Sequence, residues 1–303
     1  MSATLIAASS VSGASSTMLP PQAASPGYWA SVLHRVRRDR VAMTCALILL
    51  LLVLAAIFAP WVAPADPFKA SMLKRLQHVG SAGHWLGTDE LGRDMLSRLI
   101  YGGRLSLMMG IVPVALAFVI GTSIGVTAGF LGGKFNMAVM RTLDVFYAFP
   151  SVLLAVAISG AMGPGLSNSL MALTIVFIPQ VARVAESVTT QVAKLDYIDA
   201  ARMSGASSLT IIRVQVLGNV LGPVFVYATG LISVCMILAS GLSFLGLGVR
   251  PPEAEWGLML NTLRSAIFNN PVVAALPGAM IFITSICFNL LADGIRSAMD
   301  LRR

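Results

Sequence analysis

The feature that most restricts the fold of this chain is the stretch of residues 145–182, which contains no charged side chain. Water-soluble domains rarely contain such a run, because about a quarter of their residues are charged. Over the whole chain only 11% of the residues are charged and 56% are hydrophobic. A bilayer core of about 30 Å needs about 20 apolar helical residues, so this run is too long for one span. Gly163-Pro164-Gly165 in its middle predicts a turn between two helices.

Six apolar stretches are long enough to cross a bilayer as helices. Their expected ranges are 41–59, 105–133, 142–161, 167–184, 224–242 and 271–292. They predict an all-α polytopic membrane protein with a membrane domain over residues 35–303. The first 30 residues are rich in Ala, Ser and Pro, hold no charge and lack the pattern of a signal peptide. We therefore expect residues 1–34 to form a disordered cytoplasmic tail.

Positive charge sets the expected orientation. Four arginines directly precede the first span, namely Arg35, Arg37, Arg38 and Arg40. Basic residues beside a span favour the cytoplasmic side, and an even number of spans then places both termini in the cytoplasm. The net charge of +8 does not indicate a nucleic-acid partner, because the arginines lie beside apolar runs.

The middle of every expected span is free of charged residues. Carriers driven by protons or ions usually place ionisable groups there, so the pattern argues against a secondary carrier driven by an ion gradient. The chain also lacks the Gly-Lys-Ser/Thr loop that holds nucleotide phosphates. We therefore expect energy to enter through a partner that binds ATP, and we expect this chain itself to bind no cofactor.

Cysteine and histidine residues give no sign of a metal site. The three cysteines lie in apolar stretches, and the three histidines share no spacing typical of metal ligands. We expect no bound metal, and we expect His78 and His84 to be solvated on the outer side.

The longest segment expected on the cytoplasmic side is the loop 185–222 between the fourth and fifth spans. Its centre, residues 196–207, reads DYIDAARMSGAS. Acidic residues suit the start of a short helix, and Gly205 suits its end. The two adjacent alanines would leave one helix face low enough for another surface to approach closely. A second short helix is expected at 209–217. Taken alone, the pattern also fits an amphipathic loop on the membrane surface.

Asp199-Ala200-Ala201, followed by Gly205 and Val216-Leu217, resembles the EAA motif of ATP-binding-cassette importer permeases. The resemblance implies that the loop forms a coupling helix that docks into a groove of a cytoplasmic ATPase subunit. The residues implied in this contact are Asp196, Asp199, Ala200, Ala201, Arg202, Gly205 and Ala206. Two positions depart from the motif, with Asp199 where glutamate is usual and Gly218 where proline is usual. Both keep the expected helix-starting or helix-breaking character.

Three further segments are similar to the dipeptide, oligopeptide and nickel permeases of this class. They are residues 86–104, 242–257 and 288–296, which contain LGTDELGRD, LSFLGLG and FNLLADGIR respectively. The resemblance covers roughly residues 31–300, with the motifs in family order. It is to the C-type subunit, which pairs with a homologous B-type permease as a heterodimer.

This resemblance implies the type I importer permease fold, with six transmembrane helices, in the bacterial inner membrane. The implied partners are membrane lipid, two ATPase subunits that carry ATP and Mg, and a periplasmic or lipid-anchored substrate-binding protein. The permease itself is then not an enzyme. Dipeptides are the expected cargo, with glutathione, longer oligopeptides and nickel as alternatives. A structural or signalling membrane protein would need no such coupling loop.

The outer segment, residues 60–104, carries too many charges to enter lipid. It is expected to form a helix along the outer surface, with Asp94 and Arg98 paired on one face. The alternative is that it helps to seat the binding protein or shapes the outer gate. The residues predicted for this outer contact are Asp89, Arg93, Asp94, Glu253, Glu255 and Trp256. For Trp256, an aromatic anchor at the membrane interface is the simpler interpretation.

Small residues are frequent in the segment 241–248, after the fifth span. Such residues let a helix or re-entrant segment approach its neighbour closely, and irregular backbone at membrane depth requires protein or a water-filled cavity around it. Ser243 and Phe244 are therefore predicted to line the central path, with plain helix packing as the alternative.

Overall fold

The computed structural model describes residues 28–299, and within this range the chain forms helices and no strand. The helices are α1 (Tyr28–Arg38), α2 (Arg40–Ile57), α3 (Ala59–Val62), η1 (Met72–Lys74), α4 (Met95–Leu131), α5 (Gly133–Tyr147), α6 (Ser151–Met162), α7 (Leu166–Val192), α8 (Asp196–Met203), α9 (Ser208–Ile211), η2 (Ile212–Val216), α10 (Leu217–Phe244), α11 (Trp256–Thr262), η3 (Arg264–Phe268) and α12 (Pro271–Met299).

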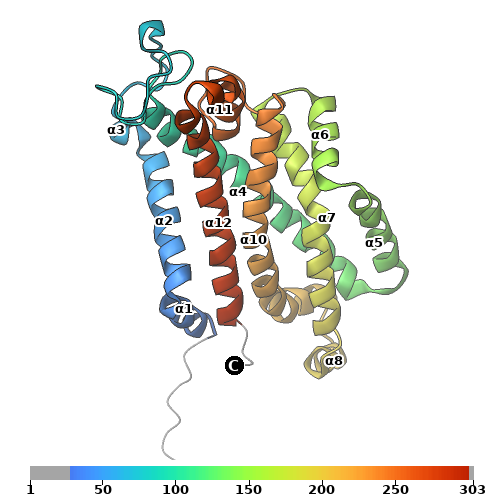
Figure 1. The fold of residues 1–303 in the computed structure, drawn as a ribbon. Helices are drawn as coiled ribbons and strands as arrows, with labels where there is room; N and C mark the ends of the chain where they lie inside the picture. Colours follow the sequence, from blue (N-terminus) through green and yellow to red (C-terminus); the bar gives the residue numbers. More distant parts are fainter. Residues whose placement is uncertain (1–27, 300–303) are drawn as a thin grey trace, which may run out of the picture.

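Five helical stretches are long and apolar enough to cross a membrane, and α5 with α6 makes a sixth crossing if the bent pair is one span. In Figure 1, α2, α12, α10 and α7 stand side by side, and α4 crosses behind them. The predicted all-α polytopic architecture is confirmed. One end of this bundle carries α1 and α8, and the other carries α3 and α11 (Figure 1); we call them the α8 end and the α11 end.

The third predicted span is not a continuous helix. The chain bends by 86° between α5 and α6, across Ala148, Phe149 and Pro150. Proline lacks the N–H that would continue the helix, and it disfavours helical backbone in the residue before it. The span expected at 142–161 is therefore a pair of helices bent at this break, and it makes a crossing if the pair is one span.

The second span begins at Met95, ten residues before the expected start. Asp94 caps it, because its Oδ2 accepts a hydrogen bond from the Ser97 N–H at 2.8 Å. Met95 and Leu99 are buried against the rest of the chain. The expected helix along the outer membrane surface is thus wrong, and residues 95–104 instead form the first turns of α4.

Helices α4 and α7 pack backbone to backbone along three glycines of α4. A Cβ atom added to Gly121, Gly125 or Gly129 would lie only 2.3–2.9 Å from a carbonyl oxygen of α7. Small residues at this spacing let membrane helices gain close van der Waals packing. The two helices therefore behave as one rigid pair through the middle of the bundle.

At the α8 end, α1 lies across the ends of α2 and α12 (Figure 1). Asp39 separates α1 from α2 and caps α2 by accepting from the Val41 N–H at 2.9 Å. Arg35 donates to the Ala298 carbonyl at the end of α12, at 3.4 Å. Residues 28–34 are thus helical, which corrects part of the expected disordered tail. Residues 1–27 lie outside the described residues.

The loop between the fourth and fifth spans is shorter than predicted. Helix α7 continues to Val192, and α9, η2 and α10 form one helical run from Ser208 to Phe244. The expected separate helix at 209–217 is therefore absent, and Gly218 does not break the helix. Val216 and Val220 on either side are fully buried, and this packing outweighs the roughly 1 kcal/mol that glycine costs in a helix.

Candidate functional site

Helix α8 forms where the sequence predicted a coupling helix. Asp196 and Asp199 stand in its first turn, where negative charge is favourable. After Met203 the chain turns through Gly205, whose φ of +79° is readily adopted only by glycine. The Gly205 N–H donates to the Arg202 carbonyl at 3.0 Å and closes the helix.

Three contacts hold α8 against the bundle. Ile198 is fully buried in the core that also contains residues of α7 and α10. The Arg202 guanidinium lies 5.3 Å from the centre of the Phe130 ring, at the end of α4. The Asn219 amide of α10 donates to the Tyr197 hydroxyl at 3.1 Å. Helix α8 is therefore attached directly to α4 and α10.

The opposite face of α8 is exposed. It presents Asp196, Asp199 and Ala200, together with Met203, of which 89% is exposed. Ala201 and Ala206 instead pack against the buried core, so the flat face predicted from two alanines rests on Ala200 alone. Met203 was not predicted, although its position four residues after Asp199 places it on the same helix face.

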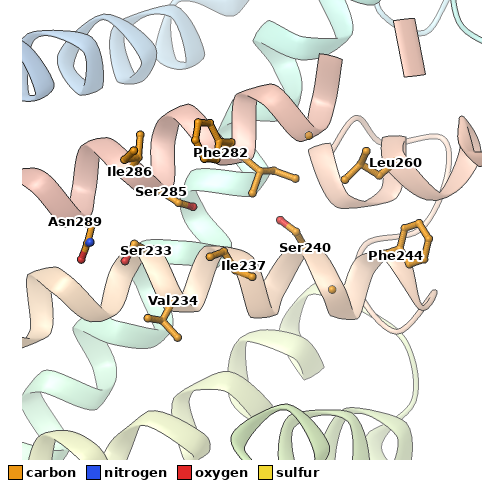
Figure 2. A pocket seen from close by; sticks show the side chains of 13 residues that line it. Ser233, Val234, Ile237, Ser240, Phe244, Leu260, Phe282, Ser285, Ile286 and Asn289 are labelled. Carbon is orange, nitrogen blue, oxygen red and sulfur yellow. The ribbon is translucent and has the colours of Figure 1, made fainter. Parts of the chain in front are cut away.

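A groove of about 680 Å³ runs between α10 and α12. Figure 2 shows side chains of both helices directed into it, with Leu260 of α11 at one end. Hydrophobic residues such as Ile237, Phe244 and Phe282 form most of its wall. Ser233, Ser240, Ser285 and Asn289 add uncharged polar groups (Figure 2), and no charged side chain lines it.

Phe244 and Ser243 lie differently relative to this groove. Phe244 lines the groove, and its place in the central path stays a prediction. Ser243 is fully buried instead, with its hydroxyl facing Met109 and the Glu255 carboxyl. The path prediction is wrong for Ser243, because neighbouring residues on a helix point about 100° apart.

The charged residues at the α11 end form a buried cluster. The Asp89 Oδ2 lies 2.7 Å from Arg93 Nε and 3.3 Å from Arg98 Nε. Arg98 also donates to the carbonyls of Pro67 at 3.1 Å and Glu253 at 3.3 Å. The predicted Asp94–Arg98 pair is thus wrong, because Arg98 instead joins residues that are 31 and 155 positions away.

Asp94 has other partners. Besides capping α4, it pairs with His84, whose Nδ1 lies 2.9 Å from the Asp94 Oδ1. The Lys74 Nζ lies 3.5 Å from the other ring nitrogen of His84. The expectation that His84 is merely solvated is therefore wrong. These contacts fasten the segment before α4 to the start of that helix.

Glu255 and Trp256 fasten α11 to α4. Glu255 is 1% exposed, and its carboxylate accepts hydrogen bonds from the Gly257 and Leu258 N–H groups at 2.9 and 2.8 Å. The Ser106 hydroxyl of α4 donates to it at 3.1 Å. Burial raises the pKa of Glu255, and these hydrogen bonds oppose the shift. The Trp256 indole donates to the Leu99 carbonyl at 2.9 Å.

Burial changes the interpretation of the outer residues. Asp89, Arg93, Asp94, Glu255 and Trp256 are all buried, and only Glu253 of the predicted contact set is exposed. Their side chains therefore have no surface to offer a binding protein in this structure. Trp256 is also not a membrane-interface anchor, because it is enclosed by protein. These residues instead connect the segments that meet at the α11 end. Of the predicted contact residues, only Glu253 remains a candidate for contact with a binding protein.

Comparison with known proteins identifies the class. Residues 121–303 match the model of the family described as "Binding-protein-dependent transport system inner membrane component". Residues 27–78 match the "N-terminal TM domain of oligopeptide transport permease C". The chain belongs to this permease family. The predicted recognition and the predicted class of ATP-binding-cassette importer permease are thereby confirmed.

Relatives of this permease are similar over nearly their full length. It is 40% identical over 281 residues to the glutathione transport system permease protein GsiD of Escherichia coli O157:H7, covering 93% of this chain and 92% of that one. It is 41% identical over 278 residues to the di/tripeptide transport system permease protein DppC of Pseudomonas aeruginosa, covering 90% of each chain.

Solved structures confirm the fold of this permease. A chain of the inward-facing MetNI methionine ABC transporter matches with a TM-score of 0.56 and 20% identity, covering 67% of this chain and 97% of that one. A chain of an amino acid ABC transporter matches with a TM-score of 0.51 and 15% identity, covering 65% and 92%. The predicted type I importer permease fold is confirmed.

Proposed function

We propose that this permease forms half of the path through which an ATP-driven importer moves short peptides, dipeptides above all. The observation that carries the proposal is the construction of α8. Its inner face is held by Ile198 and Arg202, whereas its outer face exposes Asp199 and Met203. Such a helix is suited to receive force from a partner and to pass it on to the bundle.

The proposed partners are two ATPase subunits beneath the α8 end, and one of them contacts α8. ATP and Mg belong to those subunits, and the permease performs no covalent chemistry. A homologous B-type permease completes the path, and a periplasmic or lipid-anchored binding protein delivers cargo at the α11 end. The arginines of α1 support a cytoplasmic location for the α8 end in the bacterial inner membrane.

The chain's own residues supply the transmission. Movement of α8 reaches α4 through the contact of Arg202 with Phe130, and it reaches α10 through Tyr197 and the buried Ile198. The tight backbone contact of α4 with α7 prevents these two helices from moving relative to each other. They therefore tilt together.

The relatives favour two classes of cargo. One relative is a di/tripeptide permease, and another is a glutathione permease. Glutathione is itself a small peptide, so a single path suits both. Longer oligopeptides and nickel remain the alternatives. The absence of a charged side chain from the groove favours cargo that carries its own balanced charges and is selected by the binding protein.

Uptake in cells tests this function. We expect deletion of the gene to abolish uptake of radiolabelled alanyl-alanine in a strain without another peptide importer, and expect the wild-type gene to restore it. Competition with unlabelled glutathione, tetra-alanine and nickel then ranks the cargoes. Unchanged dipeptide uptake after deletion would move the assignment to whichever competitor is itself taken up in a gene-dependent manner.

A further inference from the structure

The break between α5 and α6 encloses a second cavity, of about 250 Å³. We call it the break pocket and define it by Phe146, Tyr147, Phe149, Ser151, Pro179 and Gln180, which are among its lining residues. Helix α5 starts at the α8 end and α6 finishes at the α11 end (Figure 1). Gln180 lies near the middle of α7. The break pocket is therefore near the middle of the membrane-spanning part of the bundle.

The pocket combines polar and aromatic groups. Gln180 offers an amide that both donates and accepts hydrogen bonds, and Ser151 and Tyr147 offer hydroxyls. Phe146, Tyr147 and Phe149 are 38%, 50% and 57% exposed. No charged side chain lines the pocket. These groups match an uncharged peptide bond with a small or apolar side chain beside it.

Lipid is a poor occupant of this place. At the break, the Asp144 and Phe146 carbonyls accept from the Ala148 and Phe149 N–H groups at 3.0 and 3.3 Å, but the first N–H groups of α6 have no partner in a preceding helical turn. Broken backbone at membrane depth is tolerated where protein surrounds it or where it lines a water-filled cavity. A glutamine amide beside this break gives the same indication, because a polar side chain without a hydrogen-bond partner is costly in lipid.

Polar contacts between α5 and α7, on the side of the pocket nearer the α8 end, fix its shape. One turn from Gln180, Arg183 of α7 pairs with Asp144 of α5, and further along, the Asn136 amide of α5 donates to Glu186 of α7 at 2.7 Å. These contacts hold α5 against α7. Helix α10 packs against α6, α7 and α12, so it lies between the break pocket and the groove of Figure 2.

We propose that the break pocket is a peptide-binding station in the translocation path, in which the Gln180 amide recognises the peptide group of the cargo. This inference rests on the proposed function, because it names the part of the cargo that this chain reads. Charged termini are left to water and to the binding protein, and the aromatic rings contact the cargo side chain.

Transport of an ester analogue tests the recognition. The complete importer is reconstituted in vesicles, and uptake of alanyl-alanine is compared with that of alanyl-lactate, which lacks the peptide N–H, with the binding protein saturated by each. We expect wild type to favour the amide by about 3- to 10-fold, the range of one hydrogen bond. Gln180→Leu should bring this ratio near 1, whereas the matched control Gln191→Leu, at an exposed position of the same helix, should keep it.

A ratio that Gln180→Leu leaves unchanged would overturn the proposal. Cysteine labelling gives a second test that does not depend on cargo. Phe149→Cys should react with a water-soluble thiol reagent, against a background in which Cys45, Cys235 and Cys287 are buried. Lack of reaction with and without ATP would show that lipid or the partner permease covers the pocket. If wild type transports no dipeptide while the Phe149→Cys variant still labels, the cargo would be refuted and the water-filled pocket would stand.

Discussion

The two ends of this permease use charged residues in opposite ways. At the α11 end, Asp89 and Arg98 are 4% and 2% exposed and pair with each other. At the α8 end, Asp196 and Asp199 are exposed on a short helix. Both sets stand in motifs beside a membrane span, and from sequence both look like surfaces for a partner. Only the second set has surface to offer.

The difference teaches that charge in a membrane protein serves two purposes. Charged residues that are buried and paired with internal partners fix the path of a long connection, here the segment between α3 and α4. Charged residues on an anchored but exposed helix remain available for a partner. Substitutions separate the two purposes. Those at the α11 end should impair folding, and those at the α8 end should impair coupling to the ATPase.

The largest effect is expected at Arg98. Arg98→Ala leaves Asp89 without one of its two arginines and removes the donor for two backbone carbonyls. Breaking a buried ion pair costs about 3–5 kcal/mol, which is a large share of the stability of a domain. We expect little monodisperse permease after detergent extraction, as measured by size-exclusion chromatography. Arg264→Ala, an exposed arginine at the same end, is the control. Equal yields of the two variants would contradict a structural role for the cluster.

The next effect is expected at Gly205. Its φ of +79° strains any β-branched residue, and a Cβ atom there would touch nothing within the chain. Gly205→Val should leave the amount of permease in the membrane unchanged but abolish peptide uptake and the stimulation of the ATPase by the binding protein. Gly205→Asn separates two causes, because asparagine tolerates this conformation. Activity in the Asn variant would assign the glycine to backbone shape, and loss in both would assign it to close contact with the ATPase.

A smaller effect is expected at Met203, which is 89% exposed. Met203→Ala removes an apolar side chain that contacts a partner in the proposed complex, without touching the core. We expect the ATPase to co-purify several-fold less with the permease, while the melting temperature stays the same. Lower thermal stability with normal co-purification would reverse the assignment of this face.

The smallest effect concerns pH. Because burial raises the pKa of Glu255, the carboxyl binds its proton more tightly in the folded state than in the unfolded state. The stability that this difference provides is complete below the unfolded pKa of about 4.3, and it is lost as pH rises through the raised value. The melting temperature should therefore fall by a few degrees more over that window in wild type than in Glu255→Gln. Parallel curves would contradict a titrating Glu255.

The sequence predicted the long membrane helices of this fold and the position of α8. Long uncharged runs forced a helical membrane bundle, because only structures that satisfy their own backbone hydrogen bonds cross lipid. The helix at Asp196 and its end at Gly205 followed from local preferences that act over one or two turns. These features depend on neighbours in the chain, and so a pattern of residues could reveal them.

The sequence by itself thus determined the class, the helical membrane bundle and the position of α8. Only the tertiary structure decided that Trp256 and Glu255 are enclosed, that Ser243 faces inward while Phe244 faces the groove, and that the third crossing is bent beside Gln180. Each of these depends on contacts between residues far apart in the chain, such as Arg98 with the Glu253 carbonyl. The identity of a charged or aromatic residue does not reveal whether water, lipid or protein surrounds its side chain. The packing of the folded chain determines that environment.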